Sequence, residues 1–303
     1  MERVVDITTE GLHLAAHRGF LTVSAAGEEK GRVPLDDIGA LIVHAHGTTW
    51  SNSVIVRLSE RAVPIVVCGS NHAPVACVWP LEGHHAQSAR MRAQLVAPRP
   101  LAKRLWRQLV ASKIRMQGAA LAMAGKEGGA FEFMARKVRS GDPENVEAQA
   151  ARRYWKLLFG PAFARDRDAD GVNALLNYGY TVLRAIVSRA VCASGLHPTI
   201  GVFHANRVNA FALSDDLMEP FRPLVDLLAL RLLESGLEQV SPETKTKLAT
   251  VSSLDVEAAD GTVSPLALSA QRLAHSLANS FETGVAALDL PTRPAVARDE
   301  QLP

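Results

Sequence analysis

The sequence predicts an α+β protein with a small β-rich N-terminal domain followed by a larger all-helical C-terminal domain. Three observations predict it. Short β-prone runs separated by turn-forming residues fill the first 80 positions, a loop at residues 83–85 (GHH) follows, and helical apolar spacing begins after residue 86. The chain has 303 residues, 48% of them hydrophobic and 21% charged, so it is long enough for a sizeable core and is not disordered.

The predicted N-terminal domain, residues 1–82, contains strands and one short helix. Residues 53–61 have helical spacing, with Val54, Leu58 and Ala62 on one stripe. Two of the strand runs are continuously apolar, which suits strands covered on both faces. The predicted strands lie at residues 4–7, 12–15, 20–23, 40–43, 64–68 and 74–79.

The predicted C-terminal domain, residues 83–285, is helical and would carry the catalytic site. One of its helices should open at residue 142, where Asp142 can cap free N–H groups and Pro143 can take the first helical position. The last residues, 286–303, are predicted to form a loose tail. The helical pattern after residue 86 is broken at residues 98–100 (PRP), and further helices are predicted near residues 172–195, 220–235, 241–250 and 264–282.

Basic residues are concentrated in one segment although the net charge is only +2. Residues 83–126 contain no Asp or Glu and nine Lys or Arg. Such a surface attracts a polyanion, because each phosphate contact releases condensed counterions. The alternative is a solvated helix face whose acidic partners come from elsewhere in the fold. The candidate DNA contacts are Arg90, Arg92, Lys103 and Arg104.

The sequence favours a cytoplasmic protein with no membrane segment. Its three cysteines, Cys68, Cys77 and Cys192, form neither a CxxC pair nor an even-numbered framework, which is typical of a reducing compartment. Prolines and glycines interrupt the longest uncharged stretch, residues 62–81, and the N-terminus lacks the layout of a signal peptide.

A glutamate lies on an otherwise apolar helical stripe. Spacings of three and four place Glu147 beside Ala151, Tyr154 and Leu158. A carboxylate on such a stripe is costly to bury without a partner. It could pair with a nearby arginine such as Arg152, or it could bind a metal.

A second polar group occurs in an apolar stretch further along the chain. His204, Asp216 and Glu219 supply one imidazole and two carboxylates, and the two acids are three residues apart, so they can face one point. Together with Glu147 they would make a hard, oxygen-rich site that suits Mg²⁺ or Mn²⁺ rather than structural zinc.

Four strings in the C-terminal part are more specific than this spacing. They closely resemble signatures of the CRISPR-associated integrase-endonuclease family of spacer acquisition, and of its type II branch in particular. The resemblance extends over residues 1–285 and includes shorter strings at 34–39 (PLDDIG) and 105–108 (LWRQ). The four strings are residues 141–155 (GDPENVEAQAARRYW), 173–180 (NALLNYGY), 195–198 (GLHP) and 215–226 (DDLMEPFRPLVD).

The resemblance implies a set of site residues. Asp216 matches an acidic position beside the metal site. Arg207 and Asn209 occupy a stretch where the family often has a second polar group, and we assign neither a role. The implied catalytic and metal-binding residues are Glu147, His204 and Glu219.

The resemblance also implies a reaction and partners. The reaction is insertion of new spacer DNA into the CRISPR array, by attack of a 3′-hydroxyl on a phosphodiester, with Mg²⁺ or Mn²⁺ as cofactor. The implied partners are double-stranded DNA (prespacer and CRISPR array), a second copy of the chain, a second CRISPR adaptation protein and, as a further candidate, the RNA-guided effector nuclease. The alternatives are a non-catalytic DNA-binding scaffold of the same fold and a general nuclease unrelated to CRISPR.

Other polar and aromatic residues suggest no competing site. His44 and His46 share a strand face, but no third ligand has the spacing of a zinc motif. No Walker loop is present, so ATP use is not expected. The residues expected in the core rather than on a base-stacking surface are Trp50, Trp79, Trp106 and Trp155.

Overall fold

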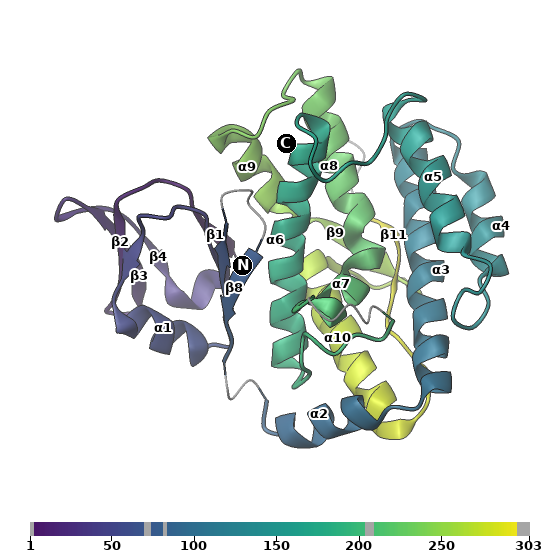
Figure 1. Cartoon of the computed structure of the whole chain (residues 1–303), viewed down its shortest axis with the longest axis horizontal. Helices are drawn as coiled ribbons and strands as arrows, with labels where there is room; N and C mark the ends of the chain where they lie inside the picture. Colours follow the sequence, from purple (N-terminus) through teal and green to yellow (C-terminus); the bar gives the residue numbers. More distant parts are fainter. Residues whose placement is uncertain (1–2, 70–73, 81–83, 204–208, 296–303) are drawn as a thin grey trace.

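The computed structural model describes residues 3–69, 74–80, 84–203 and 209–295. A β-rich N-terminal part lies beside a larger helical part (Figure 1), which confirms the predicted α+β class. Among the helices within these ranges, none combines the length and apolar character needed to cross a bilayer.

In the described residues of the N-terminal part, two sheets are joined by the helix α1 and a 3₁₀ turn, η1 (Leu35–Asp37). One sheet has the order β1-β5-β7-β8, with β1, β5 and β7 parallel, and the other has the order β4-β3-β2-β6. The elements are β1 (Arg3–Ile7), β2 (Leu12–His17), β3 (Phe20–Ala25), β4 (Glu28–Pro34), β5 (Ile38–Val43), β6 (Thr49–Trp50), α1 (Asn52–Ser59), β7 (Ile65–Cys68) and β8 (Pro74–Val78).

Burial on both faces explains why the sequence of strand β5 is continuously apolar. All six of its residues are buried. Ala40 and Ile42 pack into the core of the helical part, whereas Leu41 and Val43 pack into the core between the N-terminal sheets and α1. Because successive side chains point to opposite faces, the strand joins the two cores and holds the N-terminal part against α6.

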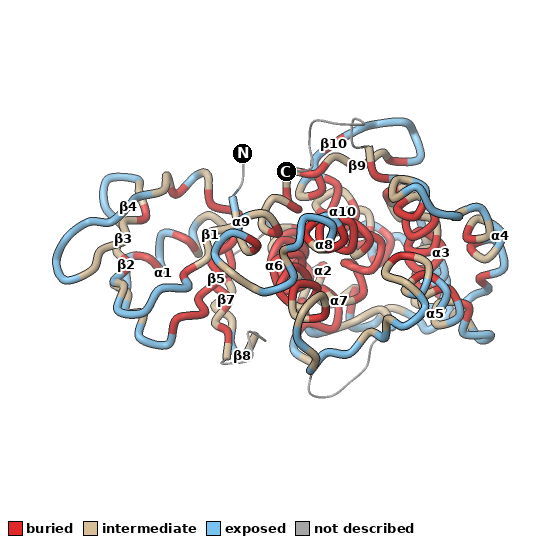
Figure 2. Tube along the Cα trace, turned by 90° about the horizontal axis from the view of Figure 1, so that it is seen from above, coloured by how far each residue is buried: buried red, intermediate tan, exposed pale blue. Residues whose placement is uncertain are grey.

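The C-terminal part surrounds the buried helix α6, which lies between the sheet and the other helices (Figures 1 and 2). Gly179 of α6 allows a close approach to α8, because an added Cβ would lie 2.4 Å from Val225 Cγ1. The helices are α2 (Gln87–Val96), α3 (Arg99–Met123), α4 (Gly129–Lys137), α5 (Val146–Phe159), α6 (Val172–Ala193), α7 (Ala212–Met218), α8 (Arg222–Glu234), α9 (Pro242–Ala249) and α10 (Leu266–Thr283). A 3₁₀ turn, η2 (Glu219–Phe221), links α7 to α8.

Two predictions about the C-terminal part were wrong. It is not all helical, because β9 (Asp255–Ala258), β10 (Val263–Pro265) and β11 (Pro291–Pro294) form a small sheet. Residues 286–295 are also not a loose tail. The Ser112 hydroxyl on α3 donates to the Pro291 carbonyl at 2.6 Å, and β11 pairs with β9.

The start of α5 also differs from the prediction. The helix begins at Val146, and Pro143 lies in the turn before it. Asp142 still caps the helix, because its carboxylate accepts from the backbone N–H groups of Val146 and Glu147 at 2.9 and 3.0 Å. The cap therefore reaches across a turn and fixes the first turn of α5, which carries Glu147.

Candidate active site

A polar cleft of about 400 Å³ opens among α3, α5, α6 and α8. Five cationic side chains and four carboxylates line it, so cations outnumber anions even before any ion binds. The charged lining residues are Lys113, Glu147, Arg165, Arg167, Arg184, Asp215, Glu219, Arg222 and Asp226.

Two carboxylates from distant segments meet around one ammonium group in this cleft. Lys113 Nζ on α3 lies 2.5 Å from Glu147 Oε1 on α5 and 2.5 Å from Glu219 Oε2 in η2. The Lys113 and Glu219 side chains are 10% and 7% exposed, whereas Glu147 is 28% exposed. The structure therefore brings together the two predicted acidic ligands, with Glu147 facing the opening more than Glu219 does.

A second cation holds the deeper carboxylate. Arg222 Nε lies 2.9 Å from Glu219 Oε1. The Arg222 guanidinium also lies over the ring of Tyr180, 4.8 Å from its centroid, in a cation–π contact. A cationic group therefore lies against each oxygen of Glu219, although this side chain is almost fully buried.

Lys113 is a site residue that the sequence reasoning did not single out. Burial alone would lower the pKa of its ammonium, but the charges of Glu219 and Glu147 raise the pKa above its ordinary value, so the lysine stays charged. A signal existed in the sequence, because spacings of three and four place Lys113 on a buried stripe of α3 with Leu109 and Met116.

A buried carboxyl group lies at the back of the cleft. Asp226 accepts hydrogen bonds from the hydroxyls of Tyr180 and Tyr154, at 2.5 and 3.0 Å. Burial raises its pKa from 3.8 to about 7, although these two hydrogen bonds and the nearby Arg222 oppose the rise. Asp226 is therefore partly protonated near neutral pH.

This shift predicts a pH-dependent stability. Between about pH 4 and pH 7 the folded state keeps a proton on Asp226 that the unfolded chain has lost, so Asp226 lowers the free energy of unfolding as the pH rises. We expect Asp226→Asn to be more stable than the parent protein above pH 7 and to lose that advantage towards pH 4. Urea unfolding at both pH values measures this, with the exposed Asp168→Asn as control. A difference that does not change with pH would contradict the prediction.

The histidine of the predicted site, His204, lies outside the described residues, but the segment leading to it is anchored. Asp216 Oδ2 accepts from the backbone N–H groups of Val202 and Phe203, at 2.6 and 2.9 Å. The Phe203 ring stacks on the buried Trp106 with centroids 4.3 Å apart. Asp216 thus holds the two residues before His204 in place, and it is not among the described residues that line the cleft.

Asn209, which had no assigned role, also supports this region. Its amide nitrogen donates to Asp215 Oδ2 at 2.8 Å, and its amide oxygen accepts from the Phe211 N–H at 2.9 Å. Asp215 in turn pairs with Arg184 at 2.7 Å. The three polar side chains connect α6 to the start of α7. Arg207 lies outside the described residues.

The four candidate DNA contacts divide into two kinds. Arg90 does not fit the expectation, because it is 7% exposed and its guanidinium contacts Glu282, His84 and the Ser194 carbonyl. It joins α2 to α6 and α10 within the fold. The exposed candidates are Arg92, Lys103 and Arg104.

The exposed group should contribute to DNA affinity independently of sequence. We expect replacement of Arg92, Lys103 and Arg104 with Gln to weaken binding similarly for different duplexes and to reduce the salt slope by about 2 to 3, because each phosphate contact contributes about 0.9. Band shifts from 50 to 200 mM salt measure this, with Arg32→Gln on β4 as control. An unchanged slope would mean that these side chains form only a solvated face.

The other residues considered from the sequence lie apart from the cleft, with one exception. Trp106 is buried as expected, but Trp155 on α5 lines the cleft. His44 is buried 3.6 Å from Asp6, at the contact between the N-terminal sheet and α6. Within the described ranges, no three His, Cys, Asp or Glu side chains form a ready metal cluster.

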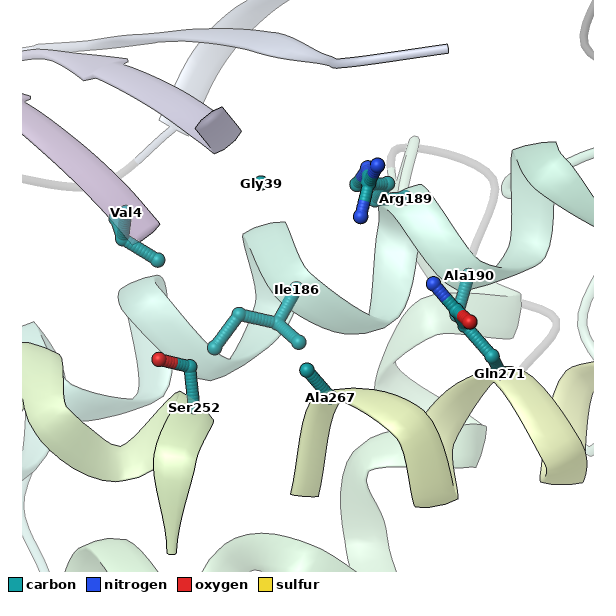
Figure 3. A pocket seen from close by; sticks show the side chains of 8 residues that line it. All are labelled: Val4, Gly39, Ile186, Arg189, Ala190, Ser252, Ala267 and Gln271. Atoms are coloured by element: carbon teal, nitrogen blue, oxygen red, sulfur yellow. The ribbon is translucent and has the colours of Figure 1, made fainter. Parts of the chain in front are cut away.

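A second hollow, between β1 and helices α6 and α10, carries no site (Figure 3). Its volume is about 10 Å³, and Val4, Ile186 and Ala267 form apolar walls. This is room for a single water at most.

The donor set of the cleft fits a divalent cation with oxygen ligands. Oxygens of Glu147 and Glu219 already converge on one cationic atom, and the cleft leaves Glu147 accessible. Carboxylate oxygens are the ligands that Mg²⁺ and Mn²⁺ favour. Completion of the set by His204 stays a prediction.

Comparisons with known proteins agree with the motif resemblance. The family model described as CRISPR associated protein Cas1 matches residues 5–251, a span that contains all four motif strings. The CRISPR-associated endonuclease Cas1 of Neisseria meningitidis serogroup C (strain 8013) is 37% identical over 228 residues, which are 75% of this chain and 74% of that protein.

Solved structures share the fold over nearly the whole chain. A casposase bound to integration product matches with a TM-score of 0.80 and 20% identity, covering 98% of this chain and 95% of that chain. A Cas6-RT-Cas1–Cas2 complex matches with a TM-score of 0.74 and 17% identity, covering 94% of this chain and 35% of that chain. The family match and the 37% identical relative confirm the resemblance seen in the motifs, and the chain belongs to the Cas1 family of CRISPR-associated proteins.

Proposed function

We propose that this chain is a metal-dependent DNA integrase-endonuclease of CRISPR adaptation, which inserts spacer DNA into the CRISPR array. One observation carries the proposal. Glu147 and Glu219, from segments far apart in the chain, converge within 2.5 Å of a single cationic atom in an open cleft rich in arginine. The name of the N. meningitidis relative and the fold of the casposase support the same reaction class.

The reaction is an in-line phosphoryl transfer. A 3′-hydroxyl oxygen forms a bond to phosphorus, and the bond from phosphorus to the leaving 3′-oxygen breaks. The attacking hydroxyl loses its proton to solvent, and the leaving oxygen takes up a proton from solvent to become a 3′-hydroxyl. A divalent cation held by Glu147, Glu219 and His204 would supply charge stabilisation on the phosphate and lower the pKa of the attacking hydroxyl. With water in place of the hydroxyl, the same site would act as an endonuclease.

The remaining cleft residues bind and orient. Arg165, Arg167 and Arg184 supply positive charge where a phosphodiester would enter. Arg165 is itself held by two amide oxygens, those of Asn173 and Asn177, at 2.9 and 2.6 Å. A fixed guanidinium loses little entropy on binding a phosphate, so it can position the scissile bond.

A strand-transfer assay tests the proposal directly. Supercoiled DNA carrying a CRISPR array is incubated with a short duplex, with and without Mn²⁺, in the presence of the second adaptation protein. Joined product that requires Mn²⁺ is the expected result.

The Lys113 ion pairs favour one second candidate, a non-catalytic DNA-binding scaffold. Both carboxylates are neutralised inside the protein, as structural acids would be. A band shift that does not depend on metal, with no joined or cleaved product, would favour the scaffold. Cleavage without dependence on the array would favour a general nuclease.

The partners follow from the same proposal. We infer double-stranded DNA as substrate, a homodimer as the working unit and Cas2 as the second adaptation protein, the last supported by the fold shared with the Cas1–Cas2 complex. The RNA-guided effector nuclease is a further candidate. The reaction belongs in the cytoplasm, which suits the free thiols of Cys68, Cys77 and Cys192.

A further inference from the structure

Four charges at the centre of the cleft balance one another. Lys113 Nζ contacts one oxygen of Glu147 and one of Glu219, and Arg222 Nε contacts the other oxygen of Glu219. Two cations therefore face two carboxylates, and three of the four side chains are at least three-quarters buried. In the absence of bound ions this cluster is neutral.

A divalent cation would disturb that balance. Binding to Glu147 and Glu219 would leave the four-residue cluster with an excess of two positive charges, on side chains of which three are largely buried. Arg165, Arg167 and Arg184 line the same cleft together with only two further carboxylates, Asp215 and Asp226, so the rest of the lining adds to the excess rather than offsetting it. Uncompensated charge in a site of this kind is costly. The cation can therefore bind well only if a resident cation withdraws or an anion arrives.

Of the two cations that contact Glu219 in the described part of the chain, Lys113 is the one able to withdraw. Arg222 is a planar group held between Glu219 and the ring of Tyr180. Lys113 carries a compact charge on a flexible four-carbon stem, and it also contacts Glu147, the most exposed member of the cluster. A small rotation could move its Nζ from the carboxylates to an anion in the cleft.

We propose that Lys113 is a resident counter-ion that couples divalent-cation binding to DNA binding. In the DNA-free protein it holds the carboxylate pair together and competes with the metal. When a phosphodiester enters, the ammonium transfers to a phosphate oxygen and releases the two carboxylates for the metal. Lys113 is thus a positioning residue for the ligand pair, and this role rests on the proposed function.

The coupling can be measured as Mn²⁺ affinity, followed by the electron paramagnetic resonance signal of free Mn²⁺. The probe is a duplex with 3′-dideoxy ends, which has no attacking hydroxyl. The double variant Glu147→Ala/Glu219→Ala lacks both carboxylates and serves as the background control, which measures the Mn²⁺ bound by the DNA itself. In the parent protein we expect DNA to tighten Mn²⁺ binding about tenfold, within the range usual for coupled sites.

Lys113→Gln should change this pattern. Without DNA, this variant should bind Mn²⁺ about tenfold more tightly than the parent protein, because the competing charge is gone. DNA should then increase the Mn²⁺ affinity of the variant by about threefold or less. Lys113→Arg keeps a charge and should retain most of the coupling. The matched control is Arg115→Gln, on the same helix, where the guanidinium pairs with Glu132 at 2.9 Å outside the cleft.

Thermal unfolding gives an independent measurement. Lys113→Gln leaves two carboxylates facing each other, so Mn²⁺ without DNA should raise its Tm more than that of the parent protein. If this variant does not fold, the parent protein alone still tests the proposal. Equal Mn²⁺ affinity of the parent protein with and without DNA would overturn it. A folded Lys113→Gln that binds Mn²⁺ no more tightly than the parent also overturns it, while the integrase function stands. If neither the parent protein nor any Lys113 variant binds more Mn²⁺ than the double variant does, both the metal site and the proposed function are excluded.

Discussion

Replacement of Glu147 or Glu219 with alanine should abolish strand joining in a protein that remains folded. Each change removes one of the two carboxylates that converge in the cleft and that we propose as metal ligands. We expect a loss of more than about 100-fold, because even residues that only support a metal ligand cost about 10- to 100-fold when removed. His204→Ala should have the same effect if the third ligand is as the motif resemblance implies. The strand-transfer assay measures each variant.

Stability must be separated from chemistry in these variants. Loss of Glu219 leaves Lys113 and Arg222 with fewer anionic partners, so thermal unfolding should be used to check that the Glu219→Ala variant is folded. Glu219→Gln keeps the shape of the side chain and offers a milder change. Glu144→Ala is the matched control, because Glu144 is exposed three residues before Glu147 and pairs with Arg139 on the surface. Full joining activity in Glu147→Ala would remove that residue from the metal site.

Removal of divalent cations should eliminate joining altogether. The two carboxylates supply hard ligands, which suit Mg²⁺ and Mn²⁺, and the imidazole of His204 would tilt the preference towards Mn²⁺. We therefore expect EDTA to stop the reaction and Mn²⁺ to restore it at least as well as Mg²⁺. Ca²⁺ should bind without supporting the reaction, because its loose coordination positions the attacking hydroxyl poorly.

The cation series distinguishes the catalytic site from a structural one. Joined product is quantified after EDTA treatment and after addition of each cation, while DNA binding is followed separately by band shift. Joining that is indifferent to EDTA, or equally fast in Ca²⁺, would exclude the metal mechanism. The band shift should persist throughout, since the exposed cations of α2 and α3 need no metal.

Local patterns predicted most of the fold, and the failures share a cause. Strand β5 was predictable because all its residues are apolar, whereas β4 was missed because five of its seven residues are exposed. Strand β4 is held by backbone pairing with β3. Because this pairing needs no buried side chains, the sequence of β4 shows no alternation of apolar and polar residues. The prediction of a loose tail at residues 286–295 fails for a related reason, because the order of this segment comes from contacts with α3 and β9, such as the hydrogen bond from Ser112.

The sequence by itself determined the α+β class and the family, because these depend on local periodicity and on motif strings, and the same strings led to the prediction of Glu147 and Glu219 as acidic site residues. Only the tertiary structure decided which charges meet. Lys113 and Glu147 are 34 residues apart, and Tyr154 and Asp226 are 72 apart, so their contacts depend on how α3, α5 and α8 pack. The same packing placed Arg90 inside the fold although its neighbour Arg92 is exposed. Burial and pairing of charge are properties of the assembled helices, and no spacing along the chain specifies them.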